Sequence, residues 1–320
     1  MIFRPVFLAL AVVVVLAFAP SAMGATLPGA STGPARDVVP QSATLTGSVN
    51  PHGSPTSYFF QYGRSTSYGQ HTDNISAGSG TSTIHVLAPI ANLRPNTKYH
   101  FRLVAFSPAG TRHGGDRTFT TPKLPVIVTI APAPNPVSFG GQMIITGHVA
   151  NAPAGVPVVL QQRVFPYTGP FTNVGNALLT DAAGNFTFGP LILPQATQFQ
   201  VVKTTKPAAK SAIFTEQVAV VATIHHKARR LRRGAEIRFY GAVSPAHDGA
   251  LYAIQRLSRG RWITVRGASL HHHNATNSRY SLRVRIRHSA RFRTFVQVVD
   301  GNHTSGTSRT LFVRIPRKKH

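Results

Sequence analysis

Apolar and polar residues alternate along most of this chain, in short runs that are separated by Gly, Pro, Asn and Ser. A period of two indicates a β-strand, because neighbouring side chains of a strand point to opposite faces of the sheet. No window combines a sustained helical period with helix caps. Strands that recur roughly every 8–12 residues without intervening helices predict sandwiches of two antiparallel sheets, so the expected fold class is all-β.

The first predicted sandwich contains five such runs. They are Ala43–Val49, Tyr58–Tyr62, Ser82–Pro89, Lys98–Phe106 and Asp116–Thr121. Four residues take alternate positions at the entry to the fourth run: Leu93, Pro95, Thr97 and Tyr99. This entry resembles the approach to the sixth strand of a fibronectin type III domain, in which a buried tyrosine hydroxyl bonds back to the preceding backbone.

The resemblance to fibronectin type III domains extends through "ATLTGSVNPHGSPTSYFFQYG" to the terminal "TFTT" and covers about residues 35–121. This chain departs from the pattern of animal fibronectin type III domains, because it has no Trp on an early strand. Leu45 is expected to fill that core position. The resemblance implies a domain without catalytic residues.

An internal repeat follows, in which "GHVANAPAGVPVVLQQ" and "GAVSPAHDGALYAIQR" align without a gap. The matched pairs are Gly147 with Gly241, Val149 with Val243, Gly155 with Gly249, Gln161 with Gln255, Phe171 with Trp262, Val174 with Val265 and Phe186 with Tyr280. A common offset of about 94 residues predicts two copies of one sandwich. Both copies resemble bacterial Ig-like repeats of secreted proteins.

These patterns predict three tandem sandwiches of the Ig-like and fibronectin type III-like kind after an N-terminal signal peptide. The expected segments are a signal peptide at 1–24, a flexible low-complexity segment at 25–35, the fibronectin type III-like domain at 36–121, a linker at 122–125, Ig-like repeats at 126–220 and 221–316, and a basic tail at 317–320. The last strand of the first repeat is expected to run almost directly into the second repeat, with limited bending there.

The N-terminus predicts export. Arg4 precedes an apolar run, Val6–Ala19, which is shorter than the ~20 residues of a membrane-spanning helix. Ala22 and Gly24 suit a signal peptidase, so cleavage is expected before Ala25, and an uncleaved anchor is the alternative. No membrane span is expected in the mature chain, which would be extracellular or retained at the cell envelope. The chain has no Cys, so buried apolar surface must hold each domain together.

Charge is concentrated at the C-terminal end. The formal net charge is +26, and residues 221–320 carry 21 of the 34 Lys and Arg but three of the eight acids. In "SRYSLRVRIRHSARFRTF" the alternation predicts that Tyr280, Leu282, Val284 and Ile286 point inward and that the intervening arginines share the opposite face. The run that follows, across a short turn, is predicted to add its arginines to that face.

We therefore expect an anion-binding face. Its predicted residues are Arg229, Arg230, Arg232, Arg233, Arg279, Arg283, Arg285, Arg287, Arg291, Arg293, Arg317, Lys318 and Lys319. The expected partners are anionic cell-envelope polymers or polysaccharide, bound in a salt-dependent way. Nucleic-acid binding is an alternative, and it predicts a contiguous positive groove. Such binding would be non-specific, because the sequence shows neither a basic helix that could enter a groove nor an aromatic platform on which bases could stack. A biased genome and a well-hydrated surface would also account for the arginines.

Catalysis is not expected. The eight carboxylates are scattered, and those such as Asp181 and Asp300 fall in turns, whereas glycoside hydrolysis needs two that face each other. Neither G-x-S-x-G nor H-E-x-x-H occurs. The sequence thus favours a non-catalytic adhesion, spacer or binding protein, and the alternative is an accessory part of a secreted polysaccharide-active hydrolase system.

No cofactor or metal ion is expected either. His271, His272 and His273 are consecutive, so at most two could converge on one ion, and zinc needs three or four ligands. Trp262, the single tryptophan, matches Phe171 of the other copy, which favours a packing role over sugar stacking.

Overall fold

The structure, a computed structural model, describes residues 26–316. Every regular element in this range is a β-strand, which confirms the all-β fold class. No helix in the described range is long and apolar enough to cross a membrane. The predicted signal peptide (1–24) and the basic tail (317–320) lie outside the described residues.

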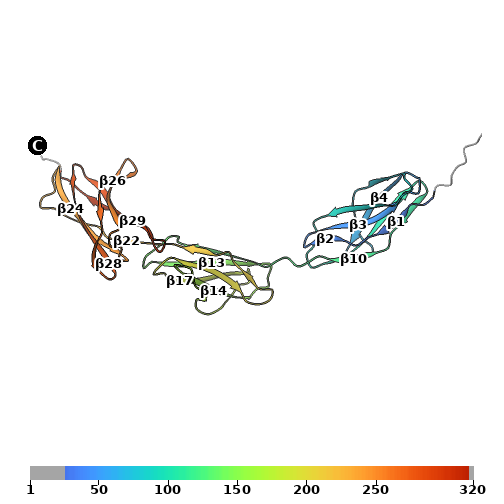
Figure 1. Cartoon of the computed structure of the whole chain (residues 1–320), viewed down its shortest axis with the longest axis horizontal. Coiled ribbons are helices and arrows are strands. Elements are labelled where there is room, and N and C mark those ends of the chain that lie inside the picture. Colours follow the sequence, from blue (N-terminus) through green and yellow to red (C-terminus); the bar gives the residue numbers. More distant parts are fainter. Residues whose placement is uncertain (1–25, 317–320) are drawn as a thin grey trace, which may run out of the picture. The chain divides into compact units, whose positions relative to one another are not determined.

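The chain divides into two compact units, with the boundary between Leu124 and Pro125. The first unit is one sandwich, with a four-stranded and a six-stranded sheet (Figure 1). The four-stranded sheet contains β1 (Gly29–Thr32), β2 (Arg36–Val39), β3 (Ser42–Asn50) and β7 (Ile84–Ile90). The six-stranded sheet contains β4 (Thr56–Gly63), β5 (Gln70–His71), β6 (Ile75–Gly78), β8 (Lys98–Ser107), β9 (Gly110–His113) and β10 (Arg117–Thr120). The five predicted strands are confirmed as β3, β4, β7, β8 and β10.

The sandwich begins earlier than expected, because part of the predicted flexible segment 25–35 is a strand. β1 pairs antiparallel with β3, and Thr32 is buried, with its Oγ1 accepting the Leu103 backbone N–H at 3.0 Å. The prediction of flexibility was wrong here. Small residues pair through their backbones at a sheet edge, and composition does not reveal such pairing.

The corner at Tyr99 has the geometry that the fibronectin type III resemblance implies. The backbone N–H of Arg94 donates to the Tyr99 hydroxyl at 2.9 Å, and the Tyr99 ring stacks on Phe119 at 5.5 Å between centroids. Leu93 and Leu45 are buried in the same core. The hydrogen bond to the Tyr99 hydroxyl and the packed aromatic pair therefore help to fix the approach to β8.

The second unit holds two separate hydrophobic cores, which define the second and third sandwiches. The strands of the second are β11 (Ile127–Ala133), β13 (Gln142–Ala150) and β17 (Asn185–Ile192) in one sheet, and β14 (Pro157–Val164), β15 (Thr172–Asn173), β16 (Leu178–Leu179), β18 (Thr197–Lys203), β19 (Ala209–Lys210) and β20 (Phe214–Glu216) in the other. Met143 lies deep in this core, 1% exposed.

The third sandwich contains the described arginines that were predicted to bind anions, and we call the surface that β28 (Asn277–Ile286) and its neighbouring strands present the basic face. The first sheet of this sandwich, called the β24–β28 sheet below, contains β22 (Val221–Ala222), β23 (His225–Lys227), β24 (Ala235–Ser244), β27 (His271–Asn274) and β28. Its second sheet, the β25–β29 sheet, contains β25 (Leu251–Ser258), β26 (Arg261–Ser269), β29 (Ala290–Val299), β30 (Thr304–Thr307) and β31 (Leu311–Val313), and it continues through β21 (Val218–Ala219) to β12 (Val137–Ser138).

The predicted repeat is visible in the strand register. Gly147 pairs with Phe186 in the second sandwich, and Gly241 pairs with Tyr280 in the third. Both glycines are needed for close packing, because an added Cβ would lie 2.4 Å from the Thr129 carbonyl oxygen at Gly147. At Gly241 it would lie 2.1 Å from the corresponding oxygen of Thr223. Matched glycines thus occupy matched sites in the two copies.

The two copies join without an intervening loop. β21 pairs in parallel with β12 of the second sandwich and with β30 of the third. Val218 belongs to the second core and Val220 to the third. Gly306 packs so tightly here that an added Cβ would lie 1.7 Å from the Val220 carbonyl oxygen. β20, β21 and β22 are separated by single residues, so the last strands of the second sandwich lead almost directly into the third.

Candidate anion-binding site on the third sandwich

The alternation predicted for β28 is confirmed. Tyr280, Leu282, Val284 and Ile286 are buried, and the arginines between them are exposed. Arg279, Arg283 and Arg285 therefore project from the outer face of the β24–β28 sheet. Arg287 is exposed just past the end of the strand.

Neighbouring strands add cations that the sequence prediction did not include. Arg238 of β24 lies directly opposite Arg283, and Lys227 of β23 lies directly opposite Arg238. The three exposed side chains form a row across three adjacent strands, which we call the cation row. Side chains directly opposite in an antiparallel pair have Cβ atoms about 5 Å apart, so like charges here oppose folding. Pairing to β24 is a long-range property, which explains why the sequence pattern missed Arg238.

One acid and two aromatic groups modify this face. Glu236 lies opposite Arg285 in the register, and it is the acid that β24 contributes to the outer face. The guanidinium of Arg238 lies 5.2 Å from the Tyr240 ring centre, and the His225 ring stacks on the same tyrosine at 5.5 Å. The aromatic ring attracts the cation and so offsets part of the repulsion.

The expected contribution of Arg291 and Arg293 to this face was wrong. Their strand, β29, pairs with β25, β30 and β31 of the other sheet and not with β28. The connection between β28 and β29 crosses from one sheet to the other instead of forming a hairpin. Alternation alone cannot distinguish the two connections, because both place the same residues inward.

The Arg293 side chain is held by two residues of the β25–β29 sheet. Its guanidinium lies 4.4 Å from the Trp262 ring centre, and its Nε donates to Gln255 Oε1 at 2.8 Å. Partial burial lowers the pKa of Arg293. Arg291 is exposed on the outer side of the β25–β29 sheet.

The loop between β23 and β24 carries a second group of predicted residues. Its four exposed arginines are Arg229, Arg230, Arg232 and Arg233. The backbone N–H of Gly234 donates to the Ile286 carbonyl at 2.8 Å, which places the end of this loop beside the end of β28. Arg317, Lys318 and Lys319 lie outside the described residues.

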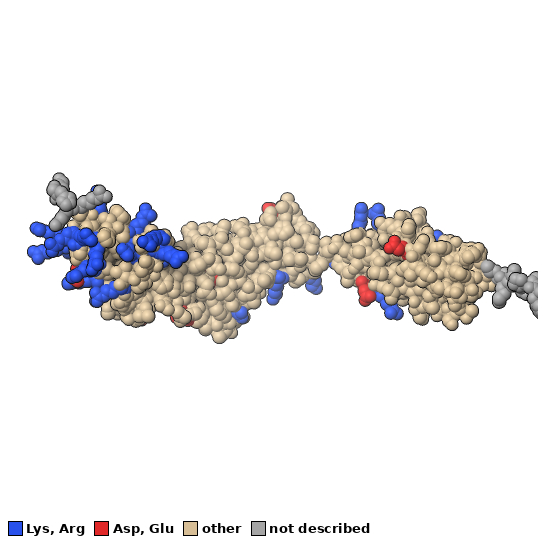
Figure 2. Space-filling view, turned by 90° about the horizontal axis from the view of Figure 1, so that it is seen from above, with Lys and Arg blue, Asp and Glu red and all other residues tan. Residues whose placement is uncertain are grey.

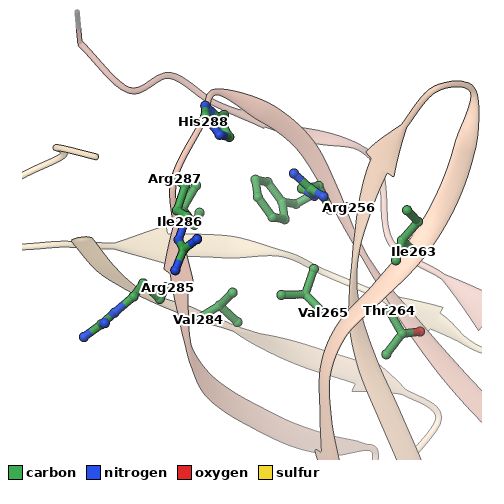
Figure 3. A pocket seen from close by; sticks show the side chains of 10 residues that line it. Arg256, Ile263, Thr264, Val265, Val284, Arg285, Ile286, Arg287 and His288 are labelled. Carbon is green, nitrogen blue, oxygen red and sulfur yellow. The ribbon is translucent and has the colours of Figure 1, made fainter. Parts of the chain in front are cut away.

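A pocket of about 540 Å³ opens between the two sheets at this end of the sandwich (Figure 3). Its polar lining comprises Arg256, Arg285, Arg287, His288 and Thr264, and its apolar lining comprises Ile263, Val265, Val284, Ile286 and Phe292. Figure 3 shows Val265 and Val284 on opposite walls and the Arg285 side chain extending outward. The pocket therefore has an apolar interior and a basic margin that continues onto the outer face.

The distribution of charge over the surface agrees with this description. Figure 2 shows Lys and Arg gathered on the third sandwich, with scattered charges on the rest of the visible surface. The described part of the third sandwich has three acids. Asp248 is hydrogen-bonded to His272 and Ser278, and Asp300 forms a turn, which leaves Glu236 as the acid beside the arginines of β28. The basic face is therefore neutralised at few places.

Trp262 takes part in an arrangement that recurs in all three sandwiches. An Arg and a Gln on paired strands share a hydrogen bond, and the Arg covers a partly buried aromatic ring. The three sets are Arg102, Gln61 and Tyr68; Arg163, Gln198 and Phe171; and Arg293, Gln255 and Trp262. Trp262 and Phe171 are thus each covered by an Arg, which supports a packing role for both.

The consecutive histidines lie on β27, and all three are exposed. His272 Nδ1 is 2.7 Å from Asp248 Oδ2, and the Ser278 hydroxyl donates to Asp248 Oδ1. These hydrogen bonds lower the pKa of Asp248.

Four pockets formed by residues 26–316 have no Asp or Glu in their walls. Asp181 forms a turn, as predicted, since its Oδ1 accepts the backbone N–H groups of Ala183 and Asn185.

Among proteins of known structure, several have a similar fold. No protein-family model and no curated protein matches the chain. The sensor domain of the anti-sigma factor RsgI4 from Pseudobacteroides cellulosolvens is 21% identical, over 31% of this chain and 92% of that one, with a TM-score of 0.24. The FN1–FN3 domains of chicken CNTN1 are 16% identical, over 91% of this chain and 100% of that one, with a TM-score of 0.26.

A tetra-tandem repeat from the extending region of a large adhesion protein is also similar. It is 10% identical, over 90% of this chain and 74% of that one, with a TM-score of 0.29. Similarities at this level concern the fold and assign no family.

Proposed function

We propose that this chain is a secreted, non-catalytic spacer and adhesion protein of the bacterial cell envelope whose third sandwich binds anionic polymers. The observation that carries the proposal is the cation row Lys227, Arg238 and Arg283, which crosses three adjacent strands of the β24–β28 sheet. Directly opposed like charges reduce stability, so a protein that keeps them is expected to use them for an anionic partner.

The arrangement of the cations favours a polymer over a small anion. The arginines are exposed and spread over a sheet face, a loop and the margin of the pocket. Each exposed ion pair contributes less than about 1 kcal/mol, so a useful affinity needs many contacts at once. A chain of carboxylate or phosphate groups can supply such contacts.

The apolar interior of the pocket limits the chemistry of the partner. Val265, Val284 and Phe292 line a space of about 540 Å³ beside Arg285 and Arg287. A sugar ring or an acyl group next to an acidic group would fit both the apolar lining and the basic margin. Acidic polysaccharide is therefore the partner we favour.

The test measures binding of the full chain to immobilised polygalacturonate, polyphosphate and double-stranded DNA. We expect tighter binding to polygalacturonate than to DNA, and a steep loss of affinity from about 50 mM to about 500 mM salt. Replacing Arg283, Arg285 and Arg287 with Ser should weaken binding by about 10-fold or more at low salt, because three charges of one face are removed.

A control of equal charge separates the face from net charge. Replacing Arg261, Arg291 and Arg314 with Ser also removes three exposed cations, outside the β24–β28 sheet. We expect this control to lose less than about 3-fold. Equal losses in both variants would show attraction by net charge alone, and binding that ignores salt would reject the electrostatic mechanism.

A further inference from the structure

Three possible metal ligands meet at the end of the third sandwich that adjoins the second. His247 follows β24, whereas Asp300 and His303 lie in the loop between β29 and β30. One ligand atom from each residue lies within 4.8 Å of the other two. This cluster is separate from the anion-binding face, and the proposal below does not depend on the proposed function.

The hydrogen bonds of His303 define which of its nitrogens is free. Its Nε2 lies 3.0 Å from the carbonyl oxygen of Pro194 in the second sandwich. A carbonyl oxygen can only accept, so Nε2 carries the hydrogen, and in a neutral ring Nδ1 bears a lone pair. The residue is 8% exposed, and its Nδ1 is buried without a hydrogen-bond partner, 3.8 Å from Asp300 Oδ2. A buried lone pair of this kind needs a cation or a donor.

His247 is oriented by the same principle. Its Nδ1 lies 2.9 Å from the Pro245 carbonyl oxygen and donates to it, and its Nε2 lies 3.1 Å from Asp300 Oδ2. With a proton, Nε2 donates to this carboxylate; a metal ion bound between the two would take the place of that proton. Both imidazoles therefore donate their outer N–H to a backbone carbonyl and turn the other nitrogen toward one carboxylate. Histidines that bind metals in proteins are commonly held in this way.

Asp300 divides its two oxygens between the loop and the cluster. Its Oδ1 accepts the backbone N–H groups of Asn302 at 2.8 Å and His303 at 2.7 Å, which fixes the turn. Its Oδ2 faces the two histidines. One oxygen of Asp300 is therefore committed to the turn, and the other is directed at the two histidines.

We propose that His247 Nε2, Asp300 Oδ2 and His303 Nδ1 bind a divalent transition-metal ion, and that the donor set suits Zn²⁺. Two imidazole nitrogens and one carboxylate oxygen are characteristic zinc ligands. With bonds of about 2.1 Å, two ligands of a tetrahedral ion lie roughly 3.4 Å apart. The distances from Asp300 Oδ2 to the two nitrogens, 3.1 Å and 3.8 Å, lie on either side of that value. The fourth position would hold water or a further ligand.

The location gives this ion a structural role. His303 donates to Pro194, and the Asn302 carbonyl accepts the Ala196 backbone N–H at 2.9 Å, so the ligand loop is bonded to the second sandwich. The His303 ring also packs in a T-shaped arrangement with Phe139 of that sandwich, at 6.2 Å between ring centres. An ion that fixes His303 would therefore stabilise the junction of the two sandwiches. The Asp300 carboxylate is partly exposed, which gives the ion access from solvent.

The test is a calorimetric titration of the full chain, without a histidine tag, with ZnCl₂ at neutral pH. We expect one saturable site per chain in addition to weaker binding by the exposed histidines of β27. His247→Gln and His303→Gln should each weaken that site by about 100-fold or more, because each removes one of three ligands. His272→Gln is the matched control, since His272 also contacts an aspartate but lies outside the cluster, and it should keep the site.

A second variant and a second readout guard against misfolding. Asp300→Asn can still accept the two backbone N–H groups through its Oδ1 while losing the charge on the facing oxygen, so it should fold and lose the site. Zn²⁺ should also raise the urea midpoint reported by Trp262 fluorescence in the wild type and not in Asp300→Asn. The absence of a saturable site, or equal zinc affinity in the wild type and Asp300→Asn, would overturn the proposal. An imidazolium–carboxylate pair would then account for the geometry.

Discussion

Glu216 is the fully buried acid of the described chain. Its Oε1 accepts the backbone N–H of Val137 at 2.9 Å, and its Oε2 is buried without a hydrogen-bond partner. Burial raises the pKa of Glu216 to about 7 from an ordinary value of 4.5, against the lowering effect of the Val137 N–H. The second sandwich therefore contains a group that ionises near neutral pH.

Glu216 makes stability depend on pH in a defined direction. Between pH 4.5 and about 7 the folded chain keeps the proton that the unfolded chain has released, so stability falls as pH rises through this range. Glu216→Gln should match the wild type near pH 5 and be more stable near pH 8, by up to roughly 3 kcal/mol. Urea unfolding at both pH values measures this, and equal differences at the two would contradict it.

The Tyr99 corner should contribute a measurable part of the stability of the first sandwich. Tyr99→Phe leaves the Arg94 N–H without its acceptor, so we expect a loss of about 1 kcal/mol in the free energy of unfolding. Tyr62→Phe is the control, because Tyr62 packs against the same core and the structure shows no hydrogen bond from its hydroxyl within the described residues. A loss of the same size in both variants would assign the effect to packing.

The difference between predicted and missed residues follows from sequence distance. Leu93 and Tyr99 are six positions apart, so their spacing was readable. His247 and His303 are brought together by strands that pair over long distances, and neither has a neighbouring motif. The tandem histidines at 271–273 were conspicuous in the sequence but remain exposed on β27.

At the level of strands, alternation predicted which β28 residues face outward but not which strands flank it. The pairing of β28 with β24, and the pairing of β29 with β25 in the other sheet, both join segments that are far apart in the sequence. The predicted face was therefore correct for Arg279, Arg283 and Arg285 and wrong for Arg291 and Arg293. Backbone pairing also explains why β1 was not predicted from its small residues.

Repulsion within the cation row should be measurable. Arg283→Thr removes the charge opposite Arg238, so we expect the free energy of unfolding to rise by about 0.2–1 kcal/mol at low salt and by less at about 500 mM salt. Arg279→Thr is the matched control on the same strand, because Arg279 lies opposite Ala242. Urea unfolding at the two salt concentrations compares them. A gain from Arg279→Thr as large as that from Arg283→Thr would argue against pairwise repulsion.

At the scale of the molecule, the second and third sandwiches share one sheet through β12, β21 and β30. We expect them to unfold together. Leu160→Ala in the second core should cost about 2–5 kcal/mol, and the urea midpoint reported by Trp262, which lies in the third sandwich, should fall with it.

The control for this coupling is Leu103→Ala, which makes the same change in the core of the first unit. It should leave the Trp262 transition in place. If Leu160→Ala also leaves that transition unchanged, the two sandwiches of the second unit unfold independently.

The burial of Met143 has a consequence for the chemistry of sulfur. The chain has no Cys and three Met, of which Met143 is the one within residues 26–316, and it is 1% exposed. Peroxide and related oxidants attack accessible thiolates and thioethers. The folded part of the chain exposes almost no thiolate or thioether to these oxidants. Its sandwiches should therefore survive oxidative conditions that would convert exposed methionines to sulfoxides and disrupt the packing around them.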